Sequence, residues 1–151
     1  MAEPPPKSYY TLIETSRGPD PAIVVVNSSL RTFAGRNRFL WHLRIEISCR
    51  LIGQNVMPAA EESETLYVIE KKMETRLARN NNAIFVSRVT CRGSRELSFR
   101  VHNPQLANDS LQELLDAPTQ SRDWNYRMER DPEWVLSAPE LTLLEKGMNV
   151  N

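Results

Sequence analysis

The sequence predicts a single α+β domain with a ferredoxin-like core, in which a split βαβ arrangement forms a four-stranded antiparallel sheet with two helices on one face. From residue 40 onward, runs with the two-residue period of strands alternate with runs of helical period, in the order strand, helix, strand, strand, helix, strand. Two β-rich runs precede this series, and we expect them to form an N-terminal β-hairpin at an edge or end of the sheet. The 151 residues, 40% of them hydrophobic, suffice for one compact core.

The N-terminal region divides into a tail and a hairpin. Residues 1–8 are rich in proline, so we expect a disordered tail there, a single domain over residues 9–147 and a short tail over residues 148–151. Tyr9–Thr15 and Ala22–Leu30 are rich in β-forming residues, and the glycine and prolines between them favour a turn.

The clearest strand is Leu40–Leu51, in which apolar and polar residues alternate strictly. Its apolar face carries Trp41, Leu43, Ile45, Ile47, Cys49 and Leu51. The other face should meet solvent or a partner. Glu61–Arg79 follows as a long helix, with Leu66, Ile69, Met73 and Leu77 at spacings of three and four residues.

The second half of the chain repeats this order. Ala83–Cys91 and Glu96–His102 are β-rich runs joined by a short connection that contains glycine, which indicates a second hairpin. Residues 108–116 have the pattern of a helix, and residues 124–129 that of a last strand. Ser137-Ala138-Pro139-Glu140 is a capping box that opens a short C-terminal helix ending at Gly147. If both long helices cover one face of the sheet, the other face is open.

Composition excludes several classes of function. The 19 basic and 19 acidic side chains cancel, so no overall field draws the protein to nucleic acid or to an anionic membrane. The sequence has neither a membrane-spanning run of about 20 apolar residues nor a signal peptide, and we expect a cytoplasmic protein. Cys49 and Cys91 lack metal-ligand spacing and are interpreted as reduced structural residues. Without a phosphate-binding loop or a hydrolase motif, the sequence favours a protein that is not an enzyme and has no cofactor or metal.

The polar face of the predicted sheet is the candidate partner-binding surface. Its residues are Arg44, Arg50, Arg88, Arg100 and Arg127, together with His42 and His102. Mixed charges of this kind also stabilise a sheet through cross-strand pairs. The two histidines fall on neighbouring strands, where such a pair can bind a metal or act as acid and base, but we interpret them as half-exposed surface residues. RNA-binding sheets carry aromatic residues on their open face, whereas the strand aromatics here follow the buried alternation.

The segment Asp131-Pro132-Glu133-Trp134 is interpreted as structural. Asp131 would cap a helix, Pro132 would take its first position, and Trp134 would fasten the C-terminal segment to the core. The alternative is a ligand pocket closed by the indole. The acidic residues Glu61, Glu62 and Glu64 are likewise interpreted as a helix start rather than a metal site.

Several segments resemble a family of bacterial proteins, domain of unknown function 695 (DUF695). They are Ala22–Asn27, Arg38–Trp41, Leu66–Glu70, Asn82–Thr90, Trp124–Tyr126 and Asp131–Trp134, and together they extend over Tyr9–Leu144. The resemblance brings no activity, cofactor or catalytic residue. Some members of the family are similar, in a second domain, to the inhibitory regulator of ribonuclease E, which implies a regulatory binding role.

The leading hypothesis is a cytoplasmic module that binds another protein to regulate or inhibit it, such as a nuclease inhibitor or an immunity protein. The rival hypothesis is a small-molecule hydrolase or nucleotide-binding enzyme with a pocket between the sheet and the C-terminal segment, near Trp134 or the histidines. RNA binding through the arginines of the sheet is the third. The sequence leaves the partner and the oligomeric state open.

Overall fold

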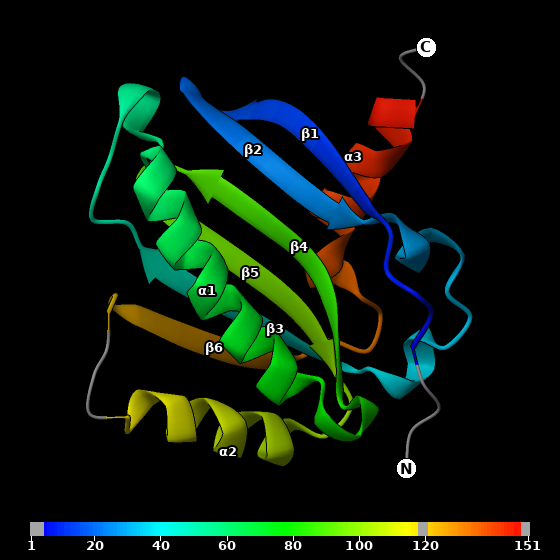
Figure 1. The fold of residues 1–151 in the computed structure, drawn as a ribbon. Coiled ribbons are helices and arrows are strands. Elements are labelled where there is room, and N and C mark those ends of the chain that lie inside the picture. Colours follow the sequence, from blue (N-terminus) through cyan, green and yellow to red (C-terminus); the bar gives the residue numbers. More distant parts are fainter. Residues whose placement is uncertain (1–4, 118–120, 149–151) are drawn as a thin grey trace.

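A six-stranded antiparallel sheet with helices on both faces forms the structure, a computed structural model that describes residues 5–117 and 121–148 (Figure 1). The strands are β1 (Tyr10–Arg17), β2 (Asp20–Asn27), β3 (Trp41–Ser48), β4 (Ala83–Cys91), β5 (Ser94–Val101) and β6 (Trp124–Arg130). The helices are α1 (Ala60–Leu77), α2 (Pro104–Leu115) and α3 (Ala138–Met148). Parts of both expected tails, residues 1–4 and 149–151, lie outside the described residues.

The strand order is β1-β2-β4-β5-β3-β6. The N-terminal hairpin lies at an edge of the sheet, as expected, and extends the four predicted strands to six, because β2 pairs with β4 from Ala22 to Val26. The expected pairing of the first and third strands of the core is confirmed, since β3 lies against β5 from Trp41 to Ser48. β6 pairs with the other side of β3 and forms one edge of the sheet, while β1 forms the other.

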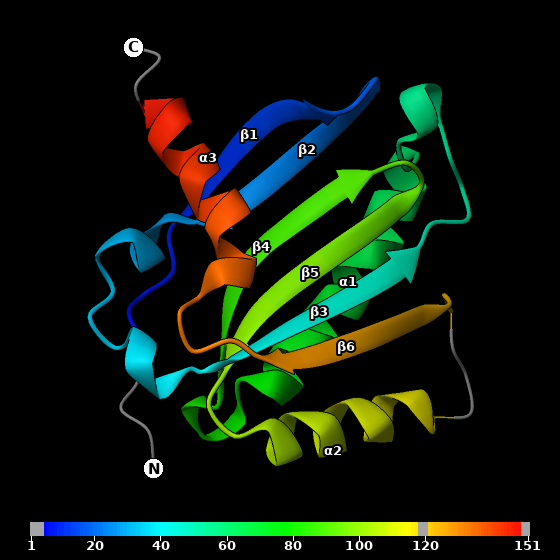
Figure 2. The same cartoon turned by 180° about the vertical axis from the view of Figure 1, so that it is seen from behind.

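The helices lie on opposite faces of this sheet. α1 and α2 pack side by side on one face, as predicted (Figure 1). α3 crosses the other face at the end of the sheet that contains β1 and β2 (Figure 2). The expectation of a fully open second face is therefore wrong. None of the helices in the described part of the chain is both long enough and apolar enough to cross a membrane.

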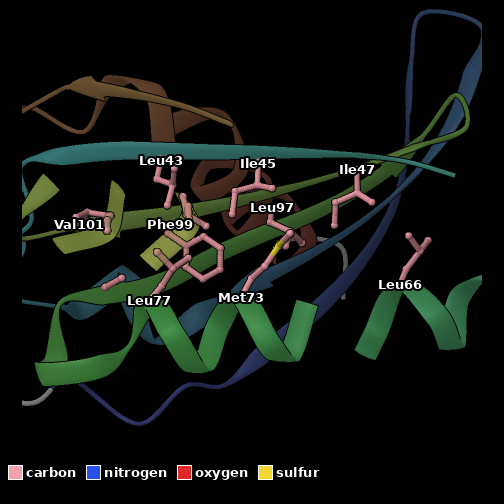
Figure 3. Packing of buried hydrophobic residues seen from close by; sticks show 12 residues of the cluster. Leu43, Ile45, Ile47, Leu66, Met73, Leu77, Leu97, Phe99 and Val101 are labelled. Atoms are coloured by element: carbon pink, nitrogen blue, oxygen red, sulfur yellow. The ribbon is translucent and has the colours of Figure 1, made fainter. Parts of the chain in front are cut away.

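The main core lies between α1, α2 and the sheet (Figure 3). Its buried side chains include Leu43, Ile45 and Ile47 of β3, Leu97, Phe99 and Val101 of β5, Leu66, Met73 and Leu77 of α1, and Ala107 and Leu111 of α2. Each large apolar side chain buried in this way contributes about 1.5–3 kcal/mol. The alternation of β3 and the helical spacing of α1 thus indicated their core faces correctly.

A second core lies on the opposite face, beneath α3. Ala22, Val24 and Val26 of β2 pack there with Val89 and Cys91 of β4 and Leu144 of α3. The apolar run of β2 is explained by this layer, because alternate residues of the strand face α3.

β4 contributes to both cores because its register shifts between Phe85 and Ser87. Before the irregularity, Ala83 and Phe85 face α1. After it, Arg88 lies opposite Leu97 and bonds to α1, whereas Val89 faces α3. One extra residue in a strand exchanges the two faces. The prediction that Arg88 belongs to the polar face was wrong for this reason.

Element ends differ from the predictions where local side-chain bonds decide them. β3 ends at Ser48, so Arg50 and Leu51 lie in a loop rather than on the strand. α2 begins four residues earlier than predicted, because the Asn103 side chain accepts hydrogen bonds from the amides of Gln105 and Leu106.

Glu62 anchors the start of α1. Its side chain is fully buried, where it accepts a bond from Arg122 Nε at 2.7 Å and one from the Arg50 amide at 2.7 Å. Arg122 precedes β6 and Arg50 follows β3, so one carboxylate ties three segments together. These bonds, that of Arg122 above all, lower the pKa of Glu62 to about 2. Glu62 therefore has a structural role beyond the predicted helix start.

The stabilisation by Glu62 should disappear in acid. A carboxyl group with a lowered pKa in the folded state stabilises the protein above its unfolded pKa, here 4.5, and loses that effect as the pH falls toward 2. We expect Glu62→Gln to lower the free energy of unfolding at pH 6, and the difference from wild type to shrink between pH 4.5 and 2. Urea unfolding across this range measures it. Glu64→Gln, at an exposed position of the same helix, is the control, and an undiminished difference at pH 2 contradicts the assignment.

Candidate protein-binding surface

The offset of the helices leaves half of each sheet face uncovered. On the α1 side, β1 and β2 have no helix over them (Figure 1). On the α3 side, no helix lies over β6 and most of β3 (Figure 2). We call the first region the apolar half-face, defined by Tyr10, Leu12, Ile23, Val25 and the neighbouring Tyr67 of α1. We call the second the polar half-face, defined by Arg44, Glu46, Glu96, Arg127 and Glu129.

Large apolar side chains on the apolar half-face are exposed to solvent. Leu12 is 63% exposed, Tyr10 54% and Tyr67 52%. Leu12 and Tyr10 lie on the α1 side of β1, because Leu12 is opposite Val25 and Val25 is opposite Arg88, which bonds to α1. Contiguous apolar surface of this kind is uncommon on monomeric proteins and marks an interaction site.

The half-face is hollowed beside α1. A depression of about 280 Å³ runs between Tyr10 and Tyr67, with Val25 and Phe85 among its lining residues. The ring of Tyr10 meets that of Phe85 edge to face at 5.8 Å, and Lys71 Nζ lies 5.2 Å from the Tyr67 ring centroid. Rigid aromatic side chains around a depression are typical of the anchor points of protein interfaces.

Charged groups at the margin of the depression are already paired within the protein. Glu70 of α1 is buried and accepts from Arg88 Nε at 3.0 Å and from Arg95 Nη1 at 3.1 Å. Lys71 forms an ion pair with Glu74 at 3.3 Å. Because these pairs satisfy the charges, a partner meets mainly apolar and aromatic surface there.

Sequence reasoning missed this surface. Tyr10 and Leu12 alternate within the first β-rich run, which was assigned to an edge or end of the sheet without a function. Tyr67 lies outside the predicted apolar stripe of its helix. The sequence did contain one indication of this surface: several large apolar residues lie outside the predicted core.

Two of the predicted surface arginines do lie on the polar half-face. Arg44 bonds to Glu96, and Arg127 lies 3.7 Å from Glu129. Arg127 is opposite Arg44 in the register, with its side chain 75% exposed. The neighbouring carboxylates balance the charges of these arginines, as expected for ion pairs that stabilise a sheet across its strands.

Arg100 and His42 are buried, in contrast to the prediction of an open face. Arg100 has no exposed surface; it donates from Nη1 to Asp131 Oδ2 at 2.9 Å and from Nη2 to the Phe39 carbonyl at 3.1 Å. His42 lies opposite Arg100, and burial, assisted by the charge of Arg100, lowers its pKa. The segment that follows β6 covers this end of the polar face, so neither residue can contact a partner.

The remaining predicted surface residues lie apart from one another. Arg50 is exposed in the loop after β3, and its amide binds Glu62. His102 is exposed just beyond β5, with Nδ1 2.6 Å from the Arg38 carbonyl. The structure thus brings together Arg44 and Arg127 alone among the predicted arginines.

The segment Asp131–Trp134 joins β6 to the C-terminal helix, and its side chains bond within the protein. Asp131 accepts from the amides of Val135 and Leu136 at 3.1 and 2.9 Å, so it caps the 3₁₀ turn Val135–Ser137 that leads into α3. Pro132 lies in the turn before this helix rather than at its first position. Trp134 is buried in a cluster with Leu30, Phe39, Ile84 and Val86, and its indole donates to the Arg36 carbonyl at 3.1 Å.

A hollow of about 480 Å³ lies beside Trp134, where the enzyme hypothesis places its pocket. Arg31, Arg36, Glu133 and Glu145 are among its lining residues. Trp134, which is 3% exposed, also lines the hollow, whereas His42, whose pKa is lowered, does not. Within residues 5–117 and 121–148, no group of three or more His, Cys, Asp or Glu side chains is placed to hold a metal ion.

Comparison with known proteins gives one match. The model of a family described as "Family of unknown function (DUF695)" matches residues 13–136. Neither the curated proteins nor the solved structures include a significant match.

The bonds of Arg100 predict a large loss of stability on its removal. Arg100→Met leaves the Asp131 carboxylate buried without its partner, and breaking a buried pair in this way costs about 3–5 kcal/mol. Urea unfolding measures the change. Arg127→Met, at an exposed site of the same sheet, should alter the free energy of unfolding by less than about 0.5 kcal/mol. Equal effects of the two substitutions contradict the assigned role of Arg100.

Proposed function

Because the chain belongs to DUF695, a family of unknown function, we propose its function from its own surfaces: it is a non-enzymatic module that binds another protein over the apolar half-face. The partner is regulated or inhibited by this binding. The observation that carries the proposal is the exposure of Tyr10, Leu12 and Tyr67 beside a depression.

The depression in the half-face has the composition expected of an interface centre. Aromatic and aliphatic side chains line it, and Lys71 and Arg88 at its margin pair with Glu74 and Glu70. Glu14 lies exposed beyond Leu12 on the same side of β1. The polar half-face, in contrast, is a mosaic of balanced ion pairs, and exposed ion pairs contribute little to affinity. The apolar half-face is therefore the better candidate for a stable complex.

We further propose that β3–β6 with α1 and α2 form a ferredoxin-like unit that the N-terminal hairpin extends. The order β4-β5-β3-β6 within the sheet and the helices on one face support this description. We also propose a cytoplasmic location, supported by the two free cysteines, Cys49 and Cys91.

Single substitutions on the half-face should abolish partner binding without unfolding the protein. We expect Leu12→Asp and Tyr67→Asp each to reduce the recovery of a specific captured protein at least tenfold, because a charge is placed where apolar surface must be buried. The measurement is quantitative affinity capture from the native cell lysate after nuclease treatment. Thermal melting of each variant verifies that it is folded.

Leu106→Asp provides the matched control, because Leu106 is an exposed leucine on α2, outside the half-face. It should retain the partner at the wild-type level. The proposal is contradicted if the control and the half-face variants lose the partner equally, or if recovery depends on intact RNA.

A further inference from the structure

β1 is an edge strand whose outer backbone groups can be assigned from its pairing. The Ser28 amide donates to the Tyr9 carbonyl at 2.7 Å, and these residues are opposite each other in the register that continues to Tyr10 and Asn27. Hydrogen-bonded and non-hydrogen-bonded pairs alternate in an antiparallel ladder. Tyr10, Leu12, Glu14 and Ser16 therefore direct their amides and carbonyls outward, away from β2.

The side chains of the same residues lie on the apolar half-face. Tyr10 and Leu12 are exposed on the α1 side, directly beside the outward backbone groups. On the opposite side, Ile13 packs against the α3 core. A strand added to this edge would thus gain backbone hydrogen bonds and would find apolar neighbours on both of its faces.

Charge protects one edge of the sheet and not the other. β6 carries Arg127, Glu129 and Arg130 within its seven residues, and such charges prevent unwanted pairing at an edge. β1 pairs with β2 over all eight of its residues without a bulge, and Glu14 is the one charge between Tyr10 and Ser16. A regular edge with few charges is a template for a further strand.

Cations stand at both ends of the β1 edge. Lys7 is exposed just before the strand, and Arg17 ends it with a side chain that is 44% exposed and pairs with Glu96 at 3.4 Å. A segment that pairs along the edge with carboxylates at its ends would complement Lys7 and would share Arg17 with Glu96.

We propose that the partner binds by strand addition: an extended segment of another protein, with alternating apolar residues in its centre and acidic residues at its ends, pairs with the outer edge of β1. This inference rests on the proposed function and specifies how the apolar half-face is used. Backbone hydrogen bonds hold the segment, and Tyr10 and Leu12 select its side chains.

The chain itself supplies a suitable probe. The sequence Ala22–Asn27 of β2 already pairs with β1 from its inner side, so its side chains suit both faces of that strand. A fluorescent peptide with this sequence between two pairs of glutamates is titrated with the full protein, and binding is followed by fluorescence anisotropy. Two control peptides carry lysines in place of the glutamates, or N-methyl groups on all three valines.

We expect the acidic peptide to bind, the lysine-flanked peptide to bind at least threefold more weakly, and the N-methylated peptide to lose at least tenfold in affinity. Glu14→Pro removes an outward amide while leaving the bonds to β2 and the apolar side chains intact, so it should weaken binding at least tenfold. Glu14→Ala is its matched control and should bind normally.

The outcomes separate this inference from the proposed function. If the wild-type protein does not bind the acidic peptide, or binds its N-methylated form equally well, strand addition is overturned; a captured partner that still depends on Leu12 and Tyr67 then leaves the proposed function standing. Sedimentation of the protein alone tests a second copy as occupant. A wild-type dimer that Glu14→Pro dissociates would overturn the assignment to another protein.

Discussion

The guanidinium of Arg100 determines how the C-terminal third of the chain crosses the sheet. It lies without solvent contact on the α3 side of β5 and bonds to the Phe39 carbonyl, the Asp131 carboxylate and the Ser137 hydroxyl, while the Trp134 ring stacks 4.5 Å from it. A buried cation is tolerated only when such acceptors surround it. These acceptors come from the loop before β3 and from the segment after β6. The segment after β6 must therefore cross back over the sheet, and this places α3 over β2.

This return explains the diagonal coverage of the sheet. α1 and α2 cover β3 and β5 on one face of the sheet, and α3 covers β2 and part of β4 on the other face. Each helix layer therefore leaves uncovered, on its own face, the strands that the opposite layer covers. The two uncovered regions differ in chemistry. A strand covered by helices on one face only has one row of side chains that faces solvent. This row is largely charged on β3 and β6, whereas on β1 and β2 it contains exposed apolar side chains such as Leu12 and Ile23.

Local patterns in the sequence predicted the local structure. The alternation of Leu43, Ile45 and Ile47 and the spacing of Leu66, Met73 and Leu77 identified their buried faces because a period depends on neighbours alone. The burial of Arg100 depends on Asp131, which is 31 positions away, and no periodicity reports such a partner. The alternation around Leu12 could not show that this side chain is exposed, because alternation in a strand does not reveal whether a helix will cover the apolar face. Six strands rather than four follow from the pairing of β2 with β4, which is equally nonlocal.

The irregularity between Phe85 and Ser87 has a consequence for how this sequence can change in evolution. β4 can serve two cores because its alternation changes phase there, so that Phe85 faces one helix layer and Val89 the other. Deletion of the extra residue at this point would restore uniform alternation and leave Arg88 on the α1 side and Val89 on the α3 side, whereas insertion of a second residue there would turn Val89 toward the carboxylate of Glu70 and Arg88 toward the apolar layer under α3. Length is therefore constrained in one direction in this strand: loss of the extra residue keeps every later side chain on its present face, whereas a further insertion moves each of them to the opposite face up to the next turn.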